Sequence, residues 1–223
     1  MKVVREKGEE YSMMVPNAVY IAGVQLDAFK PYLEDLIKIL LEWEEKAFND
    51  ERGCALDLAW ARLAAVMEES FKPYFLKIVH RVIATARIPI TTLNHDNDDS
   101  DNFVLLEDGF GYVSKTDVDR RKKVLDMLFL FTGIFVNEMA PMLETVYEIA
   151  NRSFEFPGEE LRKAGLSLML EVTSTLRQIH GKTHIRLMYM FDEIFPKLIE
   201  KASKIDDDVY TSSLRTVSKS NML

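Results

Sequence analysis

The chain has few residues that break helices, a single cysteine and no excess of basic residues. Its 223 residues include nine glycines, seven prolines and one cysteine, Cys54. A single cysteine excludes an internal disulfide, and its alanine-rich surroundings favour a small buried hydrophobe over a nucleophile. The 36 acidic residues outnumber the 28 basic ones, which gives a net charge of −8. We therefore expect no direct binding of nucleic acid, because phosphate binding depends on clustered Lys and Arg.

Long apolar runs are also absent. The first ten residues are charged and lack the apolar stretch of about 7–15 residues that a signal peptide needs. The longest uncharged apolar run extends from Met127 to Asn137. It is shorter than the roughly 20 residues that cross a bilayer. The sequence thus predicts no membrane insertion, and the run is interpreted as a buried helix.

The usual sequence motifs of enzymes are missing as well. No GxxxxGKS/T, GxGxxG or GxSxG pattern occurs, so neither a phosphate-binding loop nor a nucleophile elbow is indicated. His180 and His184 have the separation of helical zinc ligands, but Gly181 lies between them and no Glu follows His180. A hairpin turn with two exposed histidines explains the pair. We predict no catalytic residue, no metal and no cofactor.

One segment is strongly acidic. Asp96, Asp98, Ser100 and Glu107 match positions 1, 3, 5 and 12 of a calcium-binding EF-hand loop. Position 6 of that loop needs a glycine for its turn, and here it is Asp101. A solvated or partner-binding loop is the preferred interpretation, with the candidate residues Asp96, Asp98, Asp99 and Asp101.

Apolar residues recur at spacings of three and four along most of the chain, which is typical of amphipathic helices. In the first clear example, Phe29, Leu33 and Leu36 lie on one side and Lys30 and Glu34 on the other. Helices are predicted over residues 26–46, 52–69, 72–87, 117–138, 140–153, 158–180 and 183–203, the last kinked or split at Pro196.

The helices repeat. Phe29-Lys30-Pro31-Tyr32 recurs as Phe71-Lys72-Pro73-Tyr74, a spacing of 42 residues that lies in the range of HEAT repeats. Each proline is expected to open a second helix, because the N–H groups of a first helical turn have no partner inside the helix. Pro141 occupies the same place after an insertion.

The predicted fold is all-α, an α-solenoid of HEAT-type antiparallel helical hairpins with one acidic insertion loop and no sheet. A single array covers residues 1–223, with helical pairs at 7–47, 52–87, 117–153 and 158–204, the insertion loop at 89–116 and an incomplete repeat at 206–223. Neither end has the polar capping repeat that an array needs. We therefore expect a piece of a longer solenoid.

Binding is expected on the second helix of each pair, since these helices line the concave side of a solenoid. An ordinary solvated helix face accounts for the same charges. The candidate protein-binding residues are Glu34, Lys38, Glu42, Glu45, His80, Arg81, Glu144, Glu148, Glu193, Lys197 and Glu200.

An ordered series of short motifs runs through the middle of the chain. It consists of Ala59-Trp60-Ala61-Arg62, Tyr74, the Asp-rich insertion with Phe103-Val104, Phe110-Gly111 and Lys115-Thr116. In this order the chain resembles the karyopherin-β nuclear import receptors, most closely the importin-beta-3 type, over about residues 15–200.

The resemblance implies a central HEAT-repeat fragment of a receptor found in the cytoplasm, the nucleus and the nuclear pore. Implied partners are cargo proteins with basic signals, Phe-Gly nucleoporins and, through the full-length parent, Ran-GTP. The alternative is a non-transport HEAT-repeat scaffold of a multiprotein complex. Periodicity does not separate the two, because both functions use the same repeats.

Overall fold

The structure is a computed structural model. The chain forms two compact units, and the boundary between them lies between Val172 and Thr173. It describes residues 26–45, 51–93, 103–106, 111–181, 192, 195–197 and 199–200. The first unit contains most of the described residues. The boundary between the units falls within the last long helix.

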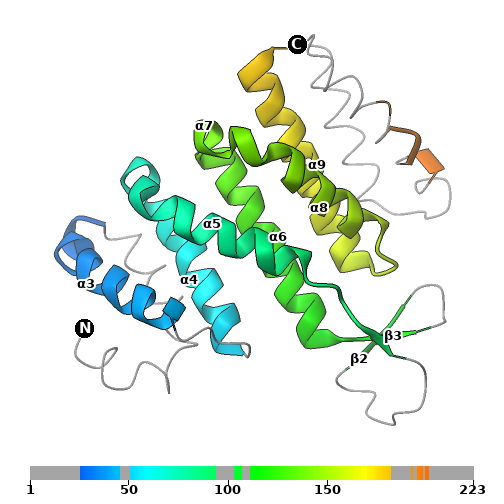
Figure 1. Ribbon diagram of the computed structural model, residues 1–223, viewed down its shortest axis with the longest axis horizontal. Coiled ribbons are helices and arrows are strands. Elements are labelled where there is room, and N and C mark those ends of the chain that lie inside the picture. Colours follow the sequence, from blue (N-terminus) through cyan, green and yellow to red (C-terminus); the bar gives the residue numbers. More distant parts are fainter. Residues whose placement is uncertain are drawn as a thin grey trace. The chain divides into compact units, whose positions relative to one another are not determined.

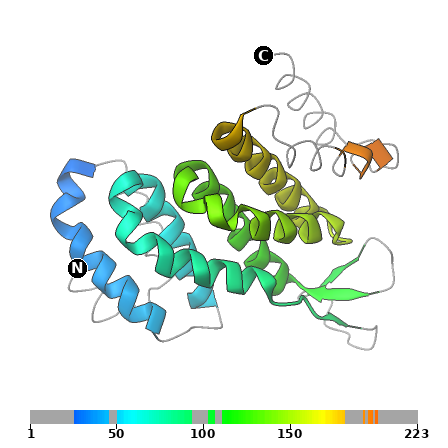
Figure 2. The ribbon, with the colours of Figure 1, turned by 45° about the horizontal axis from the view of Figure 1, so that its top comes forward.

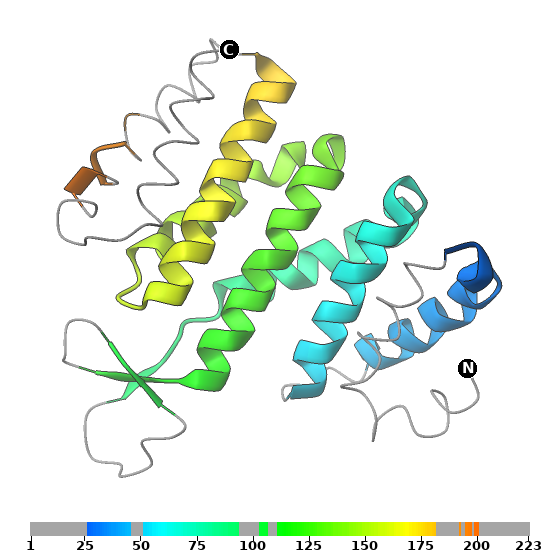
Figure 3. The same cartoon turned by 180° about the vertical axis from the view of Figure 1, so that it is seen from behind.

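Helices of the first unit form two layers, seen from opposite sides in Figures 1 and 3. One layer contains α4 (Glu51–Met67), α6 (Lys115–Ile134) and the first part of α9 (Glu159–His180). The other contains α3 (Leu26–Glu45), α5 (Lys72–Arg87) and α8 (Leu143–Glu155). Because α4 pairs with α5 and α6 pairs with α8, the layers are the first and second helices of successive hairpins, as predicted.

The turn from α4 to α5 is built from local chemistry. A short 3-10 helix, η2 (Glu68–Phe71), follows α4, and Glu68 adopts a left-handed backbone with φ of 45°. Pro73 lies in the first turn of α5, where its missing N–H costs no helical hydrogen bond. By contrast, α3 begins at Leu26. Pro31 therefore lies inside that helix and does not open it.

The turn from α6 to α8 divides what the sequence presented as one long helix over 117–138. Phe135 leaves the helical region with φ of −106° and ψ of 53°. A single turn, α7 (Val136–Met139), and the 3-10 helix η4 (Ala140–Met142) then lead into α8. Pro141 lies in η4, so the third proline does precede a second helix.

Aromatic side chains fill the space between the two hairpins of the first unit. Phe71 and Phe75, from η2 and α5, pack against Phe131 and Phe135 at the end of α6, with ring centroids 4.8 to 6.1 Å apart. All four side chains are fully buried. Trp60 of α4 meets Phe71 edge-on at 6.0 Å. Burial on this scale is the main stabilising contribution in a protein of this kind.

The insertion contains a small sheet, which corrects the prediction of a helix-only array with no sheet. Strands β1 (Thr92–Leu93), β2 (Phe103–Leu105) and β3 (Tyr112–Ser114) are antiparallel in the order β1-β3-β2. The strands connect the end of α5 to the start of α6 (Figure 2). Leu106 and Val113 of the insertion are buried. The acidic residues 94–101 lie outside the described part of the chain.

Close approach of α8 and α9 depends on a glycine. A Cβ on Gly165 would lie 2.6 Å from the backbone nitrogen of Phe154 and 2.7 Å from the carbonyl oxygen of Ala150. Both are backbone atoms, so a side chain could fit only if the helices moved apart. Gly165, near the start of α9, therefore permits the close contact of the two helices.

The second unit begins within α9, which ends at His180. Gly181 then takes a left-handed conformation with φ of 79°, and its N–H donates to the carbonyl of Arg177. This arrangement is a common helix stop, for which glycine is the favoured residue. His184 of the predicted histidine pair lies outside the described residues, and His180 is exposed.

Candidate protein-binding surface

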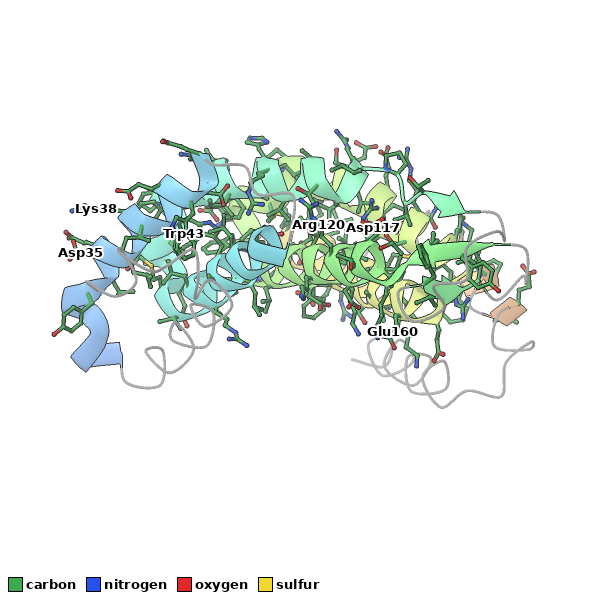
Figure 4. All side chains as sticks on the ribbon, turned by 90° about the horizontal axis from the view of Figure 1, so that it is seen from below. Asp35, Lys38, Trp43, Asp117, Arg120 and Glu160 are labelled. Atoms are coloured by element: carbon green, nitrogen blue, oxygen red, sulfur yellow. The ribbon has the colours of Figure 1, made fainter. Side chains whose placement is uncertain are left out.

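The candidate surface begins on α3, whose outer side carries charges. Glu34, Lys38, Glu42 and Glu45 are all exposed, as is Asp35. In Figure 4, Asp35 and Lys38 lie on the outer side of α3, whereas Trp43 faces the neighbouring helices. Trp43, Leu36 and Leu40 are buried. The amphipathic pattern read from the sequence thus separates a core side from an acidic outer side.

In the layer formed by α3, α5 and α8, the exposed charge changes from acidic on α3 to basic on α5. Its exposed residues include Lys77, His80 and Arg87, together with the apolar Leu76. On α8 the exposed charges are again mainly acidic, with Glu144, Glu148 and Glu155 beside Arg152. The layer is therefore not uniformly acidic. An acidic face on α3 is separated from an acidic face on α8 by a basic helix.

Several of the predicted surface residues lie outside the first unit or outside the described residues. Lys197 and Glu200 are half-buried and exposed, respectively, in the second unit. The side chain of Glu193 lies outside the described residues, as do Asp96, Asp98, Asp99 and Asp101 of the acidic loop. The candidate surface that the structure does describe is thus the set on α3, α5 and α8.

Arg81 differs from the other candidates because it lies between carboxylates of two neighbouring helices. Its Nε is 2.7 Å from Glu44 Oε2 of α3, and its Nη1 is 2.5 Å from Asp57 Oδ1 of α4. The side chains of Glu44 and Asp57 are 6% and 1% exposed. Arg81 thus connects α5 to the preceding second helix and to its own first helix.

Burial is the main influence on the acidity of Glu44 in this cluster. It raises the pKa of Glu44, and the raising prevails over the opposing effects of the Arg81 guanidinium and the Trp60 indole. Asp57 adds to the rise through like-charge repulsion. Two carboxylates buried away from water are strongly destabilising unless a cation lies close to them. Arg81 therefore has a structural role between repeats, and the sequence pattern alone had placed it on an exposed face.

Two further ion pairs connect neighbouring repeats at the surface. Lys72 Nζ lies 2.9 Å from Glu138 Oε1 of α7 and also pairs with Glu69. These hydrogen bonds raise the pKa of Lys72, and the bond with Lys72 lowers that of Glu138. Lys122 of α6 pairs with Glu160 of α9, which lowers the pKa of Glu160. Exposed pairs of this kind contribute little stability individually.

Within the described ranges, no three histidine, cysteine or acidic side chains gather as metal ligands. No single described helix is long and apolar enough to cross a bilayer. By length and composition alone, α6 and the α7–α8 segment together are long and apolar enough, but they form a pair that is bent by 116°.

Comparison with known proteins gives a consistent picture at the level of the fold. No family model and no curated protein sequence matches the chain. Among solved structures, Kap121p bound to Nup53p is similar with a TM-score of 0.67 and 19% identity, over 84% of this chain and 19% of that one.

Two further structures of the same protein cover more of the chain. Kap121p bound to the SUMO protease Ulp1p has a TM-score of 0.67 and 16% identity, over 96% of this chain and 22% of that one. Kap121p alone has a TM-score of 0.68 and 16% identity, with 96% and 23% covered. The chain thus spans about a fifth of the length of the Kap121p structures and shares their helical-repeat fold over that part.

Proposed function

We propose that this chain is a protein-binding segment of a nuclear import receptor and catalyses no reaction. The observation that carries the proposal is the structural match of 96% of the chain to part of the karyopherin Kap121p. A fold can serve several functions. Further support comes from the ordered motifs from Ala59-Trp60 to Lys115-Thr116.

The proposed partners follow from the neighbours and from charge. Kap121p is found in complexes with Nup53p and with Ulp1p. For this chain we propose cargo proteins with basic signals and Phe-Gly nucleoporins, with Ran-GTP acting through the full-length receptor in the cytoplasm, the nucleus and the nuclear pore. Basic peptides are assigned to the acidic outer side of α3, because Glu34, Glu42 and Glu45 are exposed there.

The basic helix α5 limits how far a bound basic peptide can extend beyond α3. The helix α5, on which Lys77, His80 and Arg87 are exposed, lies between α3 and α8 (Figure 1). A basic segment running across the whole layer would meet like charges at α5, which are unfavourable. We therefore assign basic signals to α3, and α8 is a separate contact surface.

The test is a pull-down with the receptor that contains this chain. Retention on a resin carrying Phe-Gly repeats, and release of a bound basic cargo by Ran-GTP, are the expected results. Failure in both assays would make a non-transport HEAT-repeat scaffold the better account. A variant lacking residues 26–200 serves as the control, since its loss of cargo binding assigns the contact to this segment.

A further inference from the structure

A pocket of 270 Å³ lies where four helices of the first unit come together at their ends. Its walls come from the end of α5, the linker 88–90, the first turns of α6, the end of α8 and the start of α9. It is away from the α3 surface. All of its lining residues belong to the unit that ends at Val172.

Three arginines and no acidic residue line this pocket. Arg87, Arg121 and Arg152 come from α5, α6 and α8, respectively. Arg121 donates to the carbonyl of Ile88 and so holds the linker that forms one wall. Arg87 Nη2 lies 3.5 Å from Thr145 Oγ1, at the long limit of a hydrogen bond. Arg152 makes no ion pair with another described residue.

Asp117 interacts electrostatically with Arg121, whereas three other described acidic residues on α8 and α9 have partners outside the pocket. Glu159 pairs with Lys163 and Glu160 pairs with Lys122, both outside the pocket. Glu155 accepts a hydrogen bond from Asn151 at 3.4 Å. Among the described residues, neither Arg87 nor Arg152 pairs with a carboxylate, in a chain whose net charge is −8.

The other walls are apolar. Ile88 is 55% exposed, Phe156 is half-buried and Ile149 is buried. A ligand that covers the exposed Ile88 would gain free energy, because apolar surface is driven out of water. The pocket thus offers an apolar wall next to donors that fit a planar or tetrahedral anion.

We propose that this pocket binds a peptide segment of a partner protein in which an apolar side chain lies next to an anionic group, either a carboxylate or a phosphate on serine. Arginine clusters recognise such groups by paired hydrogen bonds. A nucleic acid fits less well, since its further phosphates would approach the exposed Glu144 and Glu148 of α8. The ligand class is opposite in charge to the basic cargo assigned to α3, so the two sites would take different ligands.

The test uses the whole 223-residue chain and fluorescein-labelled peptides in an anisotropy titration. One peptide contains Glu-Leu-Glu-Phe, a second has Gln for each Glu, and a third has phosphoserine for each Glu. The Gln peptide is expected to bind about tenfold more weakly than the better of the two anionic peptides. Tighter binding of the phosphoserine peptide than of the Glu peptide identifies phosphate as the preferred group, and the reverse identifies carboxylate.

Matched variants locate the site. Arg152→Ala is expected to weaken binding of the better anionic peptide about tenfold. Lys77 is an exposed cation outside the pocket, and Lys77→Ala is expected to change the affinity by less than about twofold. Circular dichroism checks that both variants fold. Equal binding of the Gln peptide, or equal loss in the two variants, overturns the proposal. A large gain in affinity when Asp96, Asp98, Asp99 and Asp101 are changed to Asn also overturns it, because the occupant would then be this chain itself.

Discussion

Arg81 Nε lies 2.7 Å from Glu44 Oε2, and this contact joins helices of successive repeats. Its partner Glu44 is on α3, and the same guanidinium reaches Asp57 of α4. In a repeat protein each unit contacts only its neighbours, so stability depends on such interfaces. The pairing explains why two carboxylates are retained in an otherwise apolar contact region.

Removing this guanidinium should strongly destabilise the chain. Arg81→Met keeps much of the side-chain volume but leaves Glu44 and Asp57 buried without a cation. We expect a loss of about 3 kcal/mol in the free energy of unfolding, measured by urea denaturation. Lys38→Met is the matched control on the exposed side of α3, with an expected change within about 0.5 kcal/mol. A loss as small as that of the control would contradict the structural role of Arg81.

The raised pKa of Glu44 predicts a pH dependence of stability. Because burial raises its pKa in the folded state above the usual 4.5, the folded chain holds this proton more strongly than the unfolded chain. The stabilisation from the protonated group is full below pH 4.5 and is lost as the pH rises through the raised value.

Glu44→Gln cannot lose a proton, so its stability relative to the original chain should increase as the pH rises from 4.5 towards neutrality. Urea denaturation at several pH values measures the difference. Glu45→Gln, at the neighbouring exposed position, is the control and should follow the original chain. The prediction would be contradicted if the stability difference between Glu44→Gln and the original chain stayed constant or became smaller as the pH rises.

Gly165 predicts a steric effect. In Gly165→Ala the new Cβ would meet the Phe154 nitrogen and the Ala150 oxygen of α8 below 3 Å, and neither backbone atom can turn aside. We expect a destabilisation of about 1–3 kcal/mol by thermal or urea unfolding. Gly133→Ala is the matched control: its Cβ would meet only the end of the Glu171 side chain, and alanine favours the helix by up to about 1 kcal/mol. Equal effects at the two sites would contradict the close helix contact.

Much of the fold could be predicted because its signals are local. The predicted helix at 72–87 agrees with α5 at both ends, and 158–180 agrees with α9 within one residue. Spacing of apolar residues, the positions of Pro73 and Pro141 and the 42-residue period each depend on a few neighbouring residues. Helical repeats are well suited to such reasoning, since most of their contacts are between residues close in sequence.

Other features could not be predicted because they depend on distant residues. The sheet joins Leu93 to Tyr112 and Val104 to Val113, and strands of two or three residues give no clear alternation. Periodicity placed Arg81 on a solvated face, since it cannot show that Glu44 and Asp57 come within 3 Å of the guanidinium. The pocket was missed for the same reason, as its three arginines are 34 and 31 residues apart in sequence.

The most direct test of the binding account is the affinity of a basic peptide for this chain, measured by anisotropy at two salt concentrations. Binding through the acidic side of α3 should weaken with added salt and fall about fivefold in Glu42→Lys, because a favourable charge becomes a repulsive one. Asp119→Lys makes the same charge change at an exposed position of α6, in the other layer. It should leave the affinity nearly unchanged. Equal effects of the two variants, or binding that does not respond to salt, would contradict the assignment of the peptide to α3.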